Sequence, residues 1–191
     1  MIDNILHTIS PTIHNYFKQH ESVFIFLIRF GILYFIWKLL FHFIWKEEIL
    51  FQLYSEWSLL LINSILECCS FFLGLFNVET EIVSIDRILR LPGTIGVTVG
   101  EPCIGYDVTA LYVALIMSCK GAIKQKLWFI PMGVIIIFFV NVLRISALAL
   151  LVTINQEIWE LNHKLIFTVV VYIIIFLMWR FWLNINLSVN N

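Results

Sequence analysis

Residues 127–152 read LWFIPMGVIIIFFVNVLRISALALLV, and this stretch decides the fold because it is apolar over the length that a helix needs to cross a bilayer. Its one charged residue is Arg144. An arginine inside an apolar run is costly and usually faces a protein interior or a watery cavity, although near a helix end it also snorkels to the interface. The stretch therefore predicts a transmembrane helix with a functional or interfacial arginine near one end.

The composition of the whole chain agrees with a membrane protein. Of its 191 residues 61% are hydrophobic and 13% are charged, which lies outside the usual range of soluble proteins. The 12 Lys and Arg residues are scattered and the formal net charge is -1, so nucleic acid is not expected as a partner. We expect one membrane domain, residues 1–191.

Further apolar runs predict an all-α polytopic protein with about five to six transmembrane helices. Residues 1–22 form either an amphipathic helix lying at the interface or a frayed end. Hydropathy leaves a sixth span open. The expected spans are residues 23–45, 57–76, 105–119, 127–152 and 165–183.

The orientation rests on the short connection of residues 120–126, which holds three lysines and no acid. Such a loop stays cytoplasmic under the positive-inside rule. By alternation, residues 77–102 and 155–164 face outside, and residues 46–56 face inside together with the C-terminus. This predicts a multi-pass protein of the cytoplasmic (inner) membrane.

The external segment, residues 77–102, has a strand pattern. Leu91-Pro92-Gly93-Thr94 has the proline and glycine that a type II turn needs, and apolar residues alternate with small or polar ones over residues 95–100. We expect a β-hairpin from residues 82–91 and 94–99. Because an isolated hairpin is marginally stable, it must pack on the membrane domain or embed partly in the interface.

The predicted topology brings three reactive side chains to the outer face. Arg144 lies about 26 Å along a helix from residue 127. Cys103 and His163 lie where the two external loops meet the spans that follow them. The active site, if this topology holds, is on the extracytoplasmic face.

Cys103 has no disulfide partner in reach, because the other three cysteines fall within or at the far end of predicted spans. Pro102 suits the first position of a helix, which would place Cys103 in an opening turn that favours a thiolate. Glu101 and Asp107 oppose that charge, so a nearby cation is needed. The alternative for every cysteine is core packing, which we prefer for the remaining three: Cys68, Cys69 and Cys119.

Arg144 is a source of the required cation, and His163 is a candidate base toward the thiol and acid toward a leaving amine. Asn141 lies on the same helix face as Arg144 and is placed either to orient it or to donate to a reacting carbonyl. Metal and cofactor chemistry is not expected, since the five histidines are dispersed and the chain has neither CxxC nor HExxH.

These residues resemble the exosortase and archaeosortase group of integral membrane cysteine transpeptidases. The matching pieces are Glu101-Pro102-Cys103-Ile104-Gly105, Asn141-Val142-Leu143-Arg144-Ile145 and Asn162-His163, over roughly the C-terminal half. The chain is most similar to the short, compact members. Ile104 departs from the family, which often has a small hydroxyl residue there.

The resemblance implies a protease or transpeptidase that cleaves the C-terminal sorting signal of exported proteins through a thioacyl intermediate. Its partners would be exported proteins with a short motif, a transmembrane helix and a basic tail, met within the lipid bilayer. The matching positions imply Cys103 as nucleophile, Arg144 as stabiliser and His163 as general acid and base. Glu101, Gly105 and Asn141 support them.

Other functions remain open from the residues alone. A small transporter or channel subunit would use Arg144 in a polar path, with Asn63, Ser64 and Glu67 as further candidates. An export scaffold would leave the cysteine incidental. An intramembrane protease would hydrolyse without transfer.

Overall fold

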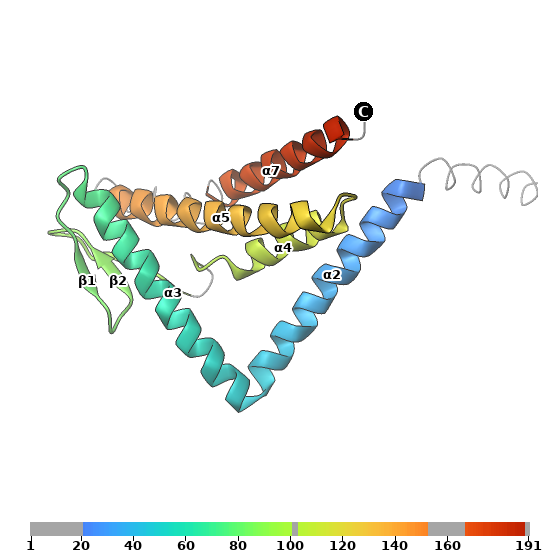
Figure 1. The fold of residues 1–191 in the computed structure, drawn as a ribbon. Helices are drawn as coiled ribbons and strands as arrows, with labels where there is room; N and C mark the ends of the chain where they lie inside the picture. Colours follow the sequence, from blue (N-terminus) through green and yellow to red (C-terminus); the bar gives the residue numbers. More distant parts are fainter. Residues whose placement is uncertain (1–20, 101–102, 153–166, 190–191) are drawn as a thin grey trace, which may run out of the picture.

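A computed structural model describes residues 21–100, 103–152 and 167–189, and these ranges are mainly helical. In sequence a small antiparallel sheet follows the first two helices, and in space it lies beside α3 at one edge of the molecule (Figure 1). The elements in order are α2 (Glu21–Lys46), α3 (Glu48–Gly74), β1 (Glu81–Val83), β2 (Ile88–Arg90), β3 (Val97–Thr98), α4 (Tyr106–Ser118), α5 (Ile123–Val152) and α7 (Phe167–Val189).

The helices have the length and surface of a membrane protein. α2, α3 and α5 are each long and apolar enough to cross a bilayer, and α4 and residues 169–185 of α7 are shorter apolar helices. Large apolar side chains such as Trp128 and Phe139 stand exposed on the outside, where lipid tails can cover them. This confirms the predicted class, a polytopic helical membrane protein with a small sheet.

α3, α4 and α7 pack on α5, the longest of the described elements, and α2 packs on α4 and α3 (Figure 1). One core cluster joins α3 and the sheet to the second half of α5, and it includes Leu66, Leu89 and Leu148. The other joins α4 and α7 to the first half of α5 around Tyr112, Phe129 and Trp182. The two ends of the α4–α5 pair are therefore built from different neighbours. We call the end with Lys120, Lys124 and Lys126 the lysine end, and the opposite one the sheet end.

A tyrosine and a glycine fasten α4 to α5. Pro131 lies inside α5 and has no N–H, so helix hydrogen bonding is interrupted there. The Tyr112 hydroxyl donates to the Phe129 carbonyl at 2.9 Å and is buried against Gly133. A Cβ at Gly133 would collide with that hydroxyl. The carbonyl that loses its donor at Pro131 is that of Leu127, four residues earlier. The Tyr112 bond to Phe129 therefore fastens α4 to α5 beside the proline and does not replace the lost helix bond.

The sheet has three antiparallel strands in the order β1-β2-β3, rather than the two predicted. The Pro92-Gly93 turn forms as expected, with Gly93 at φ 77° and the Thr94 N–H donating to the Leu91 carbonyl at 3.0 Å. The predicted first strand instead folds back on itself, because a turn with Arg87 at φ 54° divides it. Leu89, Val97 and Val99 bury one side of the sheet on the helices.

The course of α2 differs from simple alternation. Its first turn lies at the lysine end, where Lys120 Nζ donates to the Ser22 hydroxyl at 3.3 Å. At the other end of α4, Tyr54 of α3 contacts Tyr106, with ring centroids 5.5 Å apart. α2 and α3 thus form a V whose turn, near Glu47, lies away from the lysine end (Figure 1). Simple alternation predicted that residues 46–56 lie on the same side of the membrane as the lysine-containing residues 120–126. It assumes that each apolar run crosses the membrane and that the next run returns.

Candidate active site

Cys103 lies in a short turn that precedes α4. Its N–H donates to the Gly100 carbonyl at 2.9 Å, and the residue is 6% exposed within the core cluster of α3, α5 and the sheet. Cys103 itself is in a 3₁₀ turn and α4 begins only at Tyr106, so Cys103 does not lie in the opening turn of the membrane helix as predicted. The reason is Gly105, the residue before the helix, whose left-handed φ of 82° turns the chain there.

Asn141 of α5 holds this turn in place. Its side-chain Nδ2 donates to the Ile104 carbonyl at 3.2 Å, and the residue is 3% exposed. A Cβ built on Gly105 would lie 2.5 Å from the same nitrogen. Glycine is therefore required at position 105 both for its backbone angle and for the close approach of the amide. We call this contact between Asn141 and the residues on either side of the Ile104–Gly105 peptide bond the asparagine clasp.

The clasp gives Asn141 a partner that matches neither of its two predicted roles, which were to orient Arg144 or to donate to a reacting carbonyl. Its amide is engaged by the main chain next to the cysteine, rather than by Arg144. A carbonyl oxygen only accepts hydrogen bonds, so the amide nitrogen must face it. Asn141 therefore positions the Cys103 turn against α5 in this structure.

Arg144 follows Asn141 by three residues on α5, an axial rise of about 4.5 Å. It lines a cavity of about 360 Å³ between α3, α5 and α7, together with Phe72, Leu143 and Val171. Its Nε is buried and has no hydrogen-bond partner among the described residues. Such a buried donor is costly and marks a site where a ligand or another part of the chain can bond to it.

The described residues bring together part of the predicted site. Gly105 and Asn141 meet at the clasp, Cys103 lies two residues before Gly105, and Arg144 lies about one helical turn from Asn141 along α5. Within the described ranges no hydrogen bond joins the Cys103 thiol to Arg144. His163 and Glu101 lie outside the described residues.

All four cysteines of the chain are free thiols. Cys69 is buried in α3 and donates to the Val142 carbonyl at 3.4 Å, and Cys119 is buried and accepts from Trp179 Nε1 at 3.3 Å. Cys68 is partly buried in α3. Cys103 lies in a 3₁₀ turn between the sheet and α4.

Sequence reasoning missed an ion pair one turn beyond the clasp. Lys38 Nζ lies 2.7 Å from Asp107 Oδ1, and Trp37 Nε1 donates to the same oxygen at 3.3 Å. Asp107 had been expected to oppose a thiolate, and this pairing offsets its charge. The available signal was a carboxylate in the apolar run 105–119 and a lysine in the run 23–45, because membrane helices pair residues of opposite charge.

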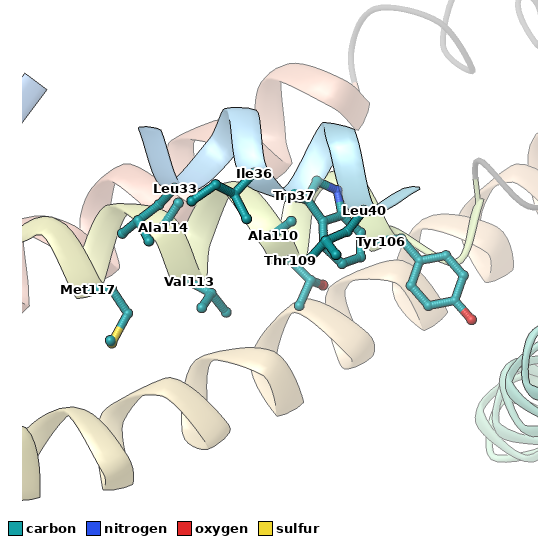
Figure 2. Close-up of a pocket in the computed structure, with 10 residues that line it drawn as sticks. All are labelled: Leu33, Ile36, Trp37, Leu40, Tyr106, Thr109, Ala110, Val113, Ala114 and Met117. Atoms are coloured by element: carbon teal, nitrogen blue, oxygen red, sulfur yellow. The ribbon is translucent and has the colours of Figure 1, made fainter. Parts of the chain in front are cut away.

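An apolar groove of about 320 Å³ runs along α4 between that helix and α2 (Figure 2). It begins at Tyr106, three residues after Cys103, and continues to Met117 (Figure 2). Thr109, Ala110 and Ala114 of α4 line the groove with small side chains. Small side chains on a membrane helix allow another helix to approach closely.

Comparison with known proteins gives one family. Residues 19–181 match the model of a family described as transmembrane exosortase. No curated protein and no solved structure gives a significant match. The match covers α2 to most of α7, including the asparagine clasp and Arg144.

Proposed function

Because the chain belongs to the transmembrane exosortase family, we propose that it is a membrane-embedded cysteine transpeptidase that cleaves the C-terminal sorting signal of exported proteins. The observation that carries the proposal is the asparagine clasp. It fixes a free cysteine in a turn directly against the helix that bears Arg144. Preorganised placement of a nucleophile is the main structural requirement for such chemistry.

The chemistry follows from the thiol. The Cys103 thiolate attacks the scissile carbonyl, and the peptide C–N bond breaks to leave a thioester on Cys103 and a free amine on the released signal. Water or an acceptor amine then attacks the thioester and restores the thiol. The amine leaving group needs a proton, which we assign to His163, and the anionic intermediate needs a cation, which we assign to Arg144.

The groove of Figure 2 suits the transmembrane helix of the substrate. It is apolar, it lies along α4, and its Tyr106 end is close in sequence to Cys103. A substrate helix lying there would present its cleavage motif at the sheet end. The extended motif can add to the edge strand β3, whose chain leads toward the cysteine turn.

A transporter or channel receives less support. Asn63 and Glu67, the polar residues proposed for such a path, are exposed on α3, and the Ser64 hydroxyl donates to the Leu60 carbonyl of its own helix. None of the three lines a described cavity together with Arg144. No observation favours this function over cysteine chemistry.

The test uses a tagged exported protein that ends in a motif, an apolar helix and a basic tail. Cys103→Ala should abolish removal of the C-terminal helix, while Cys68→Ala, a matched loss of a thiol in α3, should leave it intact. Arg144→Lys should lower cleavage strongly, because an ammonium lacks the planar fork of donors. Equal processing by Cys103→Ala and Cys68→Ala would refute the proposal.

A further inference from the structure

A second cavity lies at the lysine end, far along α4 from the cysteine turn. It has a volume of about 620 Å³ and is bounded by the start of α2, the end of α4 and the second half of α7, which gather at this end in Figure 1. Phe26 of α2 stacks on Trp179 of α7 there, with ring centroids 6.2 Å apart and an interplanar angle of 21°. The walls are therefore mainly apolar and are contributed by three helices.

Two cations stand among these apolar walls. Arg29 and Lys120 line the cavity, and both are exposed. Lys120 also donates to the Ser22 hydroxyl, which lines the cavity as well. No acidic residue is among the described residues that line it.

Among the described residues, no ion pair balances the positive charge of this end. Lys126 lies close enough for Arg29 to act on its charge, and its ammonium is occupied by the carbonyls of Met117 and Cys119, at 2.9 and 2.6 Å. Within the described ranges the ion pairs are Lys38–Asp107 and Arg90–Glu81. Arg29, Lys120 and Lys126 therefore have no carboxylate partner among the described residues.

We propose that this cavity binds one anionic glycerophospholipid from the surrounding bilayer. The lipid phosphate would lie between Arg29 and Lys120, with Ser22 as an additional donor, and an acyl chain would cover Phe26, Trp179 and Leu183. A basic pocket between transmembrane helices is the kind of site that holds anionic headgroups. The volume is also within the range of ligand pockets.

Charge and shape together select this occupant. The basic tail of a sorting signal would be repelled by Arg29 and Lys120, which have no carboxylate partner in the described ranges, and a zwitterionic lipid would gain less from these cations. Inorganic phosphate would leave the apolar walls uncovered. Because the site touches α2, α4 and α7 at once, a bound lipid joins the first described helix to the last one, independently of whether the chain cleaves any substrate.

The test is native mass spectrometry of the full chain in detergent with added phosphatidylglycerol or phosphatidylcholine. We expect one phosphatidylglycerol molecule to be retained in preference to phosphatidylcholine. Each of Arg29→Gln and Lys120→Gln should weaken retention about fivefold and the double variant about 30-fold, since each cation near a lipid surface contributes about a factor of five. Arg29→Lys and Lys120→Arg keep the charge and should retain the lipid.

Lys124→Gln is the matched control, because Lys124 is exposed in the same region but does not line the cavity. Equal loss in this variant would mean diffuse attraction to the lysine end and would overturn the site. Equal retention of the two lipids, or occupation of the cavity by a second copy of the chain, would overturn it as well. The thermal unfolding midpoint without lipid checks that each variant is folded.

Discussion

The two ends of the α4–α5 pair are joined by the same kind of side-chain to main-chain hydrogen bond, and this bond has a different role at each end. At each end a side chain of α5 donates to main-chain carbonyls at or next to α4: Lys126 to Met117 and Cys119, and Asn141 to Ile104. At the lysine end the bonded carbonyls belong to the last turn of α4, where a cation offsets the helix dipole and closes the helix. At the sheet end the bonded carbonyl belongs to the turn that carries Cys103. The first is a helix cap, and the second positions the turn that carries Cys103, the proposed nucleophile.

Substitutions at the sheet end should therefore lower cleavage activity. Gly105→Ala brings a Cβ to 2.5 Å from Asn141 Nδ2 and requires a left-handed backbone angle from alanine. We expect cleavage of the tagged exported protein to fall about 100-fold, since a displacement of about 1 Å in a catalytic group has that effect. Gly74→Ala is the control, because a Cβ there meets nothing within 4 Å. Normal cleavage by Gly105→Ala would mean that the clasp does not position Cys103.

Substitutions in the middle of the α4–α5 pair should lower the stability of the protein. Gly133→Ala forces a methyl group into the buried Tyr112 hydroxyl, so we expect it to destabilise the protein by about 1–3 kcal/mol. Gly31→Ala, in an open part of α2, should instead be neutral or stabilise by up to about 1 kcal/mol. Thermal unfolding in detergent measures both. Equal midpoints for the two variants would contradict the packing described for Gly133.

A substitution at the lysine end should lower the stability of the protein without directly lowering its cleavage activity. Lys126→Met leaves the Met117 and Cys119 carbonyls without their donor, and we expect a loss of about 1.5–3 kcal/mol. Lys124→Met, at an exposed position, should change stability by less than about 0.5 kcal/mol. The measurement is the unfolding midpoint together with cleavage below it. If Lys126→Met lowered cleavage without lowering the midpoint, the distinction between the two ends would fail.

The smallest effect is expected at the Lys38–Asp107 pair. Its side chains are 45% and 59% exposed, so the pair should contribute no more than about 1 kcal/mol. Asp107→Asn removes the charge while keeping an oxygen for Trp37. We expect a small fall in the unfolding midpoint and cleavage within about threefold of the parent, because a charge pair of this exposure is weak. A loss as large as that of Gly105→Ala would place Asp107 in the site.

The sequence predicted the elements better than their arrangement. Apolar runs located the helices, because burial in lipid imposes a length and a composition that can be read directly. The V of α2 and α3 was not predictable, since hydropathy carries no information on whether consecutive helices return or diverge. The Arg87 turn was also missed, because a positive φ at a residue other than glycine has no strong sequence signal.

The site was predicted as a set of residue types, and its contacts were not. Cys103 and Arg144 stand out locally, one as an unpaired thiol and the other as a charge in an apolar run. The asparagine clasp joins residues 36 positions apart, Gly105 and Asn141, and no periodicity links them. The left-handed angle of Gly105 also moved the start of α4 past Cys103, which the preceding proline alone did not indicate.

The most direct test of Cys103 as the nucleophile is detection of its thioester with the substrate. The full chain should be incubated with the tagged exported protein, quenched in acid, and digested for mass spectrometry with and without hydroxylamine. We expect a substrate fragment on the peptide that contains Cys103, released by hydroxylamine, and no such adduct in Gly105→Ala at the same time point. Cleavage that proceeds with the adduct on Cys68, Cys69 or Cys119 would contradict Cys103 as the nucleophile. Cleavage without any adduct, both in the parent and in His163→Ala, would contradict it as well.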